Sequence, residues 1–595
     1  MTSRGRILEI NGPLVTARLP HALTGEQVSI GELGLTGEVL GRRGENAILQ
    51  AYESTENLRP GDGVQPLGHP LSVELGPGLL GRIFDGVQRP LADIARLYGD
   101  TIPRGVGIPP LDREASWSFS PRPGLAVGER IGGSDSLGEV PETASIVHHI
   151  LMPPQIAGEL VWIAPAGDYG VDDTIARVRD ASGKEHDLRL FHRWPVREPR
   201  PYKRRDHAVE PLVCGQRILD LFFPVLKGGK AAIPGPFGAG KTILQHQIAR
   251  WSDADIVIYV GCGERGNELV DVLDSFPGLT DPHTGRSLME RTLLVANTSN
   301  MPVVAREASI YVGVTLAEYY RDQGFHVVMV ADSTSRWAEA LREVGGRLGE
   351  MPVEEGYPAY LASRLSAFYE RAGKVETLSG RRGSVTLVGA VSPPGGDFSE
   401  PVTSHTKQIV RAFWALSKGL ADARHYPAIA WSDSFSDYVD IVADWWAENV
   451  NVNWARYRAE ALDLLTQADE LARIVNLVGP EALSRQQRWV LEMARLIREG
   501  LLQQSALDET DSYASVGKQF ELLKLMHDTY NQGKLLLEEG IPVQVLLEVP
   551  QLTRIIRARS LFGNDELDAI RALGNEVSQA FQAIRGEYDQ VEQMQ

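Results

Sequence analysis

The sequence predicts a multidomain chain with an N-terminal β-barrel, a β-rich insertion, a central α/β domain and a C-terminal α-helical bundle. Three observations indicate this arrangement. Glycine-separated strand-like runs fill the beginning of the chain, apolar runs of strand length alternate with helical stretches in the middle, and helical periodicity takes over after residue 441. The length of 595 residues agrees with it, because about 150 residues per domain gives about four domains.

Residues 1–72 are expected to form the β-barrel. Turn residues such as Asn11-Gly12-Pro13 separate short apolar runs at a regular rhythm, which is typical of a small barrel or sandwich. The expected strands are Ile7–Ile10, Leu14–Leu19, Val28–Ile30, Thr36–Val39 and Ala47–Ala51.

Residues 110–195 are expected to form the β-rich insertion. The stretch is rich in proline and glycine, as at Pro153-Pro154, but aromatic and branched residues persist throughout it. A disordered linker would lack those residues, so we interpret the stretch as a compact folded unit.

Residues 73–109 and 196–440 together are expected to form the α/β domain. Buried-looking strand runs alternate here with helical stretches, which is the pattern of a parallel sheet with crossover helices. The expected strands are Ala231–Ile233, Ile256–Val260, Thr292–Ala296, His326–Ala331, Val385–Val391 and Ala428–Trp431.

Residues 441–595 are expected to form the helical bundle. Apolar residues from Leu464 to Val478 recur in steps of four and three, and Gly479-Pro480 supplies a stop signal. The segment holds 15 Lys and Arg against 24 Asp and Glu, so it carries −9 of the total charge. We interpret these charges as the solvated face of the bundle.

The composition excludes several classes of protein. The net charge of −18 weighs against a dedicated nucleic-acid binder, because neutralising phosphates requires clustered Lys and Arg. The two cysteines, Cys214 and Cys262, cannot form a disulfide scaffold and lack the spacing of a zinc site. No apolar run approaches the roughly 20 residues that span a bilayer, and no apolar signal region precedes Glu9. We therefore expect a soluble, cytoplasmic protein.

The strongest motif is the run Gly235–Thr242, which matches GxxxxGK[ST] at every fixed position. It follows the expected strand Ala231–Ile233 and precedes a helical run, as a phosphate-binding loop requires. Its backbone N–H groups would face phosphate oxygens, Lys241 would reach the β- and γ-phosphates, and the Thr242 hydroxyl would ligate Mg²⁺. The predicted nucleotide-binding residues are Gly235, Pro236, Phe237, Gly238, Ala239, Gly240, Lys241 and Thr242.

Two acidic residues follow neighbouring strands. Asp332 ends an apolar strand and is the expected second magnesium contact, through water, although it could equally cap the following helix. Glu264 and Arg265 follow the strand after the phosphate-binding loop, where ligands of α/β sheets bind. Glu264 could activate the attacking water and Arg265 could hold the γ-phosphate, or the two could form a local ion pair.

The loop Ser392–Asp397 contains paired prolines and glycines at the end of an expected strand. Such residues fix the direction of the backbone without contributing side-chain chemistry. We therefore expect a structural or subunit-facing role for it.

These motifs in this order closely resemble the catalytic A subunit of the vacuolar/archaeal-type rotary ATPases. The likeness extends from the barrel into the helical part, and it implies that the α/β domain is RecA-like. The matching runs are Trp194–Arg200, Pro234–Thr242, Tyr259–Glu268, Ala296–Ile310, Ala331–Glu343, Glu355–Ala362 and Val388–Phe398.

The resemblance implies roles for individual residues. Lys241 and Thr242 would bind phosphate and Mg²⁺, Glu264 would be the catalytic carboxylate, Arg265 would contact the γ-phosphate and Asp332 would be the magnesium acid. Tyr426 falls where relatives place an aromatic ring against adenine, although it could also be an ordinary core tyrosine.

The resemblance also implies partners. The family forms an alternating ring of three A and three B subunits around a central rotor stalk, and a B subunit completes each catalytic site with an arginine. Hydrolysis or synthesis of ATP, with Mg²⁺ bound together with ATP or ADP, is coupled to proton or sodium movement through a separate membrane sector. The insertion would contact a peripheral stalk, the chain would associate peripherally with the membrane, and no nucleic acid would bind.

The sequence departs from the family pattern at three places. Ala239 stands where the family often has cysteine or serine, Ala430 where the signature expects Asn, Asp or His, and Ala514-Ser515 where Cys-Pro is usual after a tyrosine. We expect these departures to affect the adenine side and the interface near Ala430, and not the phosphate chemistry.

Three other classes of protein share parts of this pattern. Export ATPases of flagellar or type III systems share the Gly-Glu-Arg motif but are shorter and lack the insertion. A non-catalytic ring subunit lacks the intact phosphate-binding loop that this chain has together with Glu264. An RNA-dependent ring helicase or termination factor is disfavoured by the net charge of −18.

Overall fold

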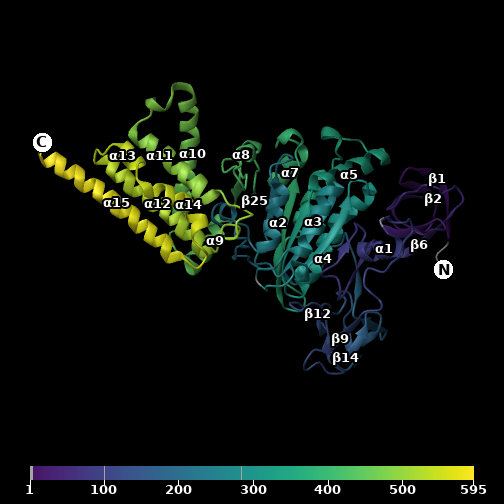
Figure 1. The fold of residues 1–595 in the computed structure, drawn as a ribbon. Helices are drawn as coiled ribbons and strands as arrows, with labels where there is room; N and C mark the ends of the chain where they lie inside the picture. Colours follow the sequence, from purple (N-terminus) through teal and green to yellow (C-terminus); the bar gives the residue numbers. More distant parts are fainter. Residues whose placement is uncertain (1–3, 100, 283, 595) are drawn as a thin grey trace.

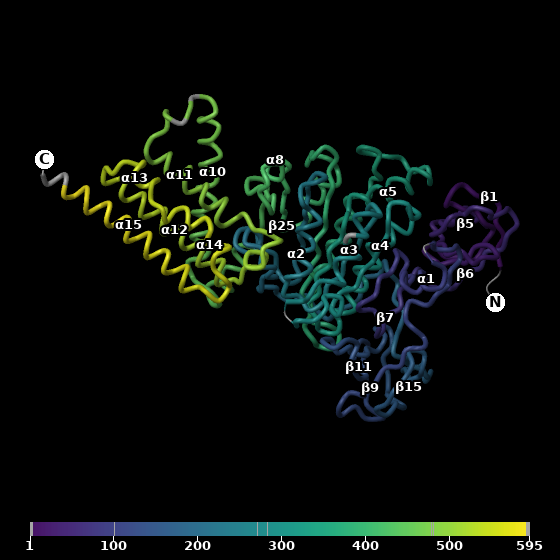
Figure 2. Tube along the Cα trace, in the orientation of Figure 1, coloured from purple at the N-terminus to yellow at the C-terminus, as the bar shows by residue number. Residues whose placement is uncertain are grey.

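The computed structural model describes residues 4–99, 101–282 and 284–594. The chain is elongated (Figure 1): the N-terminal barrel lies at one end, the α/β domain in the middle and the helical domain at the other end. The insertion lies below the α/β domain in this view and projects away from it (Figure 2). The four predicted kinds of domain are therefore present.

The N-terminal strands close into a six-stranded barrel with the order β1-β2-β5-β4-β3-β6. Alternate residues such as Val15, Val28 and Leu49 fill its core and are fully buried, as expected for strands with one face inward. The strands are β1 Gly5–Asn11, β2 Leu14–Arg18, β3 Glu26–Ile30, β4 Leu35–Arg43, β5 Asn46–Ala51 and β6 Gly63–Pro70.

The insertion consists of two four-stranded sheets with the orders β10-β13-β15-β16 and β12-β11-β9-β14. The sheets enclose their own apolar core around Phe119, Ile150 and Val178. The strands are β9 Ser116–Pro121, β10 Arg130–Ile131, β11 Ser136–Pro141, β12 Val147–Leu151, β13 Gly158–Ile163, β14 Gly167–Gly170, β15 Thr174–Asp180 and β16 Glu185–Arg189. Nearby, β7 Ser72–Leu75 pairs with β17 His192–Pro195.

The α/β domain is built on a largely parallel sheet with the order β26-β25-β19-β24-β22-β20-β21-β8. Its strands are nearly all apolar because both faces are covered by other elements. They are β8 Ile83–Phe84, β19 Lys230–Pro234, β20 Ile256–Glu264, β21 Thr292–Thr298, β22 His326–Asp332, β24 Arg382–Val391, β25 Ala412–Phe413 and β26 Phe435–Ser436, with β18 Arg204–Arg205 and β23 Gly373–Glu376 at the side.

One predicted strand is wrong. Ala428–Trp431 forms a single isolated bridge, between Ile429 and Leu416, and no strand. The reason is a turn that begins within it, because the carbonyl of Ala430 accepts hydrogen bonds from the N–H groups of Asp433 and Ser434. The buried apolar residues of this segment pack without joining the sheet.

Helices cover the sheet, and α4 is buried along almost its entire length. The helices of this part are α1 Leu91–Tyr98, α2 Lys241–Trp251, α3 Gly266–Gly278, α4 Val303–Asp322, α5 Thr334–Leu348, α6 Leu361–Tyr369, α7 Pro401–Ile409 and α8 Lys418–Asp422. A π-helical turn spans Ile218–Phe222.

The C-terminal domain is helical, as predicted. The periodic stretch lies in α10, and the N–H of Gly479 closes that helix on the carbonyl of Val475 at 2.9 Å. The last helix, α15, runs along the outside of the bundle to the C-terminal end (Figure 1). The helices are α9 Val439–Asn449, α10 Trp454–Val478, α11 Arg485–Ile497, α12 Val516–Glu538, α13 Val543–Leu547, α14 Pro550–Leu561 and α15 Leu567–Met594.

Within the described ranges, none of these helices combines the length and the apolar character needed to cross a membrane.

Candidate nucleotide-binding and catalytic site

The predicted phosphate-binding loop joins β19 to the N-terminus of α2 at the carboxyl edge of the sheet. Gly238 and Gly240 have φ values of 79° and 85°, in the left-handed region that glycine adopts without steric cost. Gly240 precedes the first residue of α2, so the free N–H groups of that helix face the loop. This arrangement is a ready-made phosphate site.

Lys241 is the first residue of α2, and its ammonium donates a hydrogen bond to the Ser392 hydroxyl. Ser392 directly follows β24, the strand that lies beside β19. Ser392 was not among the predicted site residues, because the composition of its loop predicts a structural or subunit-facing role.

Asp332 is the last residue of β22 and is 3% exposed. One carboxylate oxygen accepts a hydrogen bond from the Tyr259 hydroxyl at 3.3 Å, and the buried Gln245 side chain also interacts with the carboxylate. Burial raises the pKa of Asp332, and the nearby Lys241 opposes that effect. The cap of α5 is Ser333, whose side chain accepts from the N–H of Arg336. Asp332 is therefore free to face the site.

Glu264 is the last residue of β20, and this strand pairs with β22, so Glu264 and Asp332 end neighbouring strands. Burial raises the pKa of Glu264 to about 8, with further contributions from the charge of Asp332 and a hydrogen bond with Glu268; Lys241 acts in the opposite direction. A carboxyl group with such a pKa beside a phosphate site can exchange a proton near neutral pH. Glu268 was not predicted as part of the site. Its position in the first turn of α3, directly after the strand that carries Glu264, could have indicated that it lies close to Glu264.

Arg265 does not form the ion pair with Glu264 that was the alternative to a contact with the γ-phosphate. Its guanidinium instead lies over the ring of Phe237, 5.1 Å from the ring centroid. Phe237 is 76% exposed, so this cation–π contact lies at the mouth of the phosphate-binding loop.

A cavity of about 330 Å³ opens beside the phosphate-binding loop. Tyr426 lines it and is 39% exposed, so it is not an ordinary core tyrosine. A carbon added at Gly240 would lie 3.2 Å from the Tyr426 ring, which places the ring directly against the loop. The lining comes from both the α/β and the helical domain: Gln216, Gly240, Ile243, Leu244, Gln247, Arg424, Tyr426, Pro427, Gln503, Gln504, Ser505, Ala506, Leu507 and Arg559.

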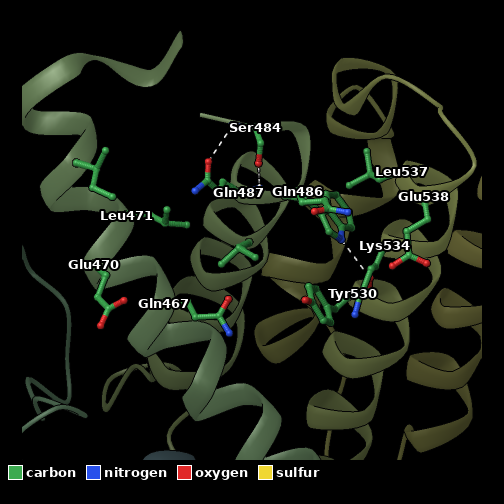
Figure 3. Close-up of a pocket in the computed structure, with 13 residues that line it drawn as sticks. Gln467, Glu470, Leu471, Ser484, Gln486, Gln487, Tyr530, Lys534, Leu537 and Glu538 are labelled. Carbon is green, nitrogen blue, oxygen red and sulfur yellow. Dashed lines mark hydrogen bonds between the residues drawn. The ribbon is translucent and has the colours of Figure 1, made fainter. Parts of the chain in front are cut away.

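A larger cavity of about 690 Å³ lies in the helical domain (Figure 3). Gln467, Glu470 and Leu471 of α10 face Tyr530 and Lys534 of α12 across it. No phosphate-binding loop or neighbouring pair of strand ends contributes to this cavity. Its size alone does not make it the functional site.

Comparison with known proteins agrees with this geometry. The model of the ATP synthase alpha/beta family nucleotide-binding domain matches residues 215–436, and the beta-barrel domain of the same family matches residues 7–68. The alpha/beta subunit barrel-sandwich domain matches residues 108–197, and the C-terminal domain of V and A type ATP synthase matches residues 443–542.

Full-length relatives decide the family. The V-type ATP synthase alpha chain of Nitrosococcus oceani is 66% identical over 98% of this chain and 99% of its own length. The chain belongs to the family of V-type and A-type ATP synthase A subunits. The A-type ATP synthase subunits A of Methanopyrus kandleri and Thermococcus kodakarensis are 52% and 51% identical, each over 98% of this chain and over 98% and 100% of their own lengths.

Membership makes this chain a catalytic, nucleotide-binding subunit of an ATP synthase coupled to ion transport. Among solved structures, the ATPase EscN of the type III secretion system of enteropathogenic E. coli matches with a TM-score of 0.62 over 88% of this chain and 99% of its own. At 22% identity, that likeness concerns the fold alone.

The three departures from the V/A-type pattern lie at contacts within the chain. Ala239 is fully buried inside the phosphate-binding loop, and Ala430 is 9% exposed. The N–H of Ala514 donates to the carbonyl of Gly215 at 3.0 Å. The neighbouring Tyr513 stacks on Trp251 of α2 with ring centroids 5.1 Å apart, so this segment joins the helical domain to the α/β domain.

Proposed function

We propose that this chain hydrolyses ATP, or synthesises it from ADP and phosphate, with Mg²⁺ at the carboxyl edge of its parallel sheet. The observation that carries the proposal is the convergence of Lys241, Asp332 and Glu264 from β19–α2, β22 and β20. The positive charge of Lys241 lies close enough to both carboxyl groups to oppose the rise in their pKa values. Phosphate binding, a magnesium contact and a water-activating carboxylate are the three parts that phosphoryl transfer requires.

The residues present fit a magnesium ion. Asp332 is buried at the end of β22, and Thr242 lies in the first turn of α2, directly after Lys241. A carboxylate and a hydroxyl group are oxygen donors of the kind that Mg²⁺ prefers. Mg²⁺ is usually held by one or two protein groups together with substrate phosphates and water. Thr242 would hold the ion directly and Asp332 through water. When bound, the ion neutralises charge on the β- and γ-phosphate oxygens.

Glu264 would accept a proton from the attacking water at its carboxylate. Residues Gly235–Thr242 would bind the phosphates, and Lys241 would contact the β- and γ-phosphates. Arg265 would leave the Phe237 ring to bind the γ-phosphate, which offers the planar guanidinium a stronger partner than the exposed aromatic ring. In the direction of synthesis, the same groups would hold ADP and phosphate.

Tyr426 would stack on the adenine base in the cavity of about 330 Å³. Replacing Tyr426 with alanine is expected to weaken ATP and ADP binding about tenfold, because a stacked base is worth roughly 1–3 kcal/mol. Tyr426→Phe keeps the ring and should bind as the wild type does. Inorganic tripolyphosphate, which has no base, should bind both variants equally in the same titration. A matched loss of tripolyphosphate affinity in Tyr426→Ala would contradict the role.

The assembly would be an alternating ring of three such chains and three B subunits, with a central rotor stalk and a peripheral stalk. The B subunit would contribute an arginine to the site, and the ring would associate peripherally with a membrane sector that moves protons or sodium. What supports this is the family membership together with the exposed position of Phe237 and Arg265 at the mouth of the site. We also propose domain limits at 1–72, 110–195, 73–109 with 196–440, and 441–595.

Metal removal tests the proposed turnover. The assembled complex is expected to lose at least 99% of its ATPase rate in excess EDTA and to recover it when Mg²⁺ is restored, because phosphate charge cannot otherwise be neutralised. Lys241→Ala should abolish turnover whether or not Mg²⁺ is present. Single-stranded RNA should leave the rate unchanged. A rate that survives EDTA would refute the magnesium site, and a rate that rises with RNA would favour the helicase alternative.

A further inference from the structure

Ser392 and the phosphate-binding loop lie at the same level along the strands of the sheet. Its predecessor Val391 ends β24 and pairs in parallel register with Pro234, the last residue of β19. The N–H of Gly235, the first residue of the loop, donates to the carbonyl of Val391 at 3.0 Å. The loop and Ser392 therefore leave two adjacent strands at the same level of the sheet.

Two hydroxyl groups of α5 hold the backbone around Ser392 in place. The N–H of Ser392 donates to the Ser335 hydroxyl at 2.8 Å, and the Thr334 hydroxyl donates to the carbonyl of Ala390 at 2.9 Å. Thr334 and Ser335 begin the helix that follows Asp332 and Ser333. The position of Ser392 is thus tied to the strand end that carries the magnesium acid.

The Ser392 hydroxyl accepts a hydrogen bond from the ammonium of Lys241. A hydroxyl group also has one proton to donate, and in the described part of the chain the Ser392 hydroxyl donates it to no acceptor. The Ser392 hydroxyl is therefore available as a donor next to the Lys241 ammonium, which is expected to contact phosphate. This arrangement differs from the structural or subunit-facing role that the composition of the loop predicts.

We propose that Ser392 contacts the γ-phosphate: its hydroxyl accepts from Lys241 and donates its own proton to a γ-phosphate oxygen when ATP binds. A group within hydrogen-bonding distance of the Lys241 ammonium lies beside the β- and γ-phosphates that this lysine contacts. ADP offers no γ-oxygen, so Ser392 distinguishes the triphosphate from the diphosphate. The proposal deepens the proposed function of the same site and rests on it.

The test compares nucleotide affinities of the assembled complex with the wild-type chain, Ser392→Ala and Ser392→Thr. The probes are Mg·ADP and the slowly hydrolysed analogue Mg·AMP-PNP, and kcat and KM for ATP are measured in parallel. Ser392→Ala is expected to weaken AMP-PNP about tenfold or more and ADP less than about twofold, as loss of one hydrogen bond to a charged group predicts. Ser392→Thr keeps the hydroxyl and should restore the wild-type ratio. Ser399→Ala, at an exposed position two residues after this loop, is the matched control: its hydroxyl donates to the exposed Asp397 and not to Lys241, so neither affinity should change.

Equal loss of ADP and AMP-PNP affinity in Ser392→Ala would overturn the proposal, because a displaced Lys241 or loop weakens both ligands alike. No loss of either would overturn it as well, and so would a threonine variant as weak as the alanine variant when its thermal midpoint is unchanged. Failure of the proposed function would look different: Lys241→Ala would then bind both nucleotides as tightly as the wild type does.

Discussion

Replacement of Glu264 by glutamine is expected to lower the ATP turnover of the assembled complex by about 1,000-fold or more. The amide has nearly the shape of the carboxylate but cannot accept the proton of the attacking water, and a positioned general base contributes roughly 10²–10⁴-fold. Mg·ATP and Mg·ADP should still bind, since Lys241, Thr242 and the loop backbone are unchanged. The measurement is single-turnover hydrolysis together with a nucleotide titration. A fully active variant complex would eliminate Glu264 as the catalytic carboxylate.

The pH profile of the wild type belongs to the same prediction. Burial, the charge of Asp332 and the hydrogen bond with Glu268 raise the pKa of Glu264 to about 8 in the free chain. The base works only when deprotonated, so kcat/KM for ATP should fall as the pH drops below about 8 and level off above it. Glu268→Gln removes one of the groups that raise this pKa, and it should shift the inflection to lower pH while preserving turnover. An inflection that stays in place would assign the profile to another group.

Asp511→Ala is expected to cost about 3–5 kcal/mol in the stability of the junction between the α/β and helical domains, the range measured when one partner of a buried ion pair is removed. Asp511 is fully buried between two arginines: its carboxylate lies 2.7 Å from the Arg217 guanidinium and also pairs with Arg559. Arg217 is itself fully buried and donates to the carbonyls of Leu501 and Gln503, each at 2.7 Å. Without Asp511, two guanidinium groups would face each other uncompensated.

Urea and thermal midpoints, followed by proteolysis at the junction, measure this loss. The matched control is Arg554→Ala, which breaks a pair with Glu576 whose side chains are 48% and 42% exposed, and it should cost less than about 1 kcal/mol. Asp511→Asn keeps the shape of the side chain and one acceptor oxygen but removes the negative charge, so it should lose nearly as much stability as Asp511→Ala, because both guanidinium groups then lack a counter-charge. If Asp511→Asn is as stable as the wild type, packing and not charge holds the junction.

Local patterns in the sequence predicted the parts of the site that lie within one strand–loop unit. The phosphate-binding loop, Asp332 and Glu264 each follow a short apolar strand, and parallel topology brings such strand ends to one edge. The contact between Lys241 and Ser392 joins residues 151 positions apart, so no local pattern contains it. The same holds for Leu507 and Arg559, which reach the Tyr426 cavity from another domain. The predicted strand Ala428–Trp431 is wrong because apolar composition indicates burial but does not show whether a turn interrupts the hydrogen bonding of the sheet.

The Tyr426 cavity has walls from two domains, since Gln504 and Arg559 come from the helical one. The side chain of Gln504 accepts from the N–H of Arg217 at 2.9 Å, and its own N–H donates to the carbonyl of Gly215 at 2.8 Å. A ligand that fills the cavity therefore touches both domains at once. Mechanical work that displaces the helical domain therefore changes the dissociation constant of that ligand, about tenfold for each 1.4 kcal/mol delivered. Because such coupling is reciprocal, binding of the ligand can in turn do the same amount of work on the position of the helical domain.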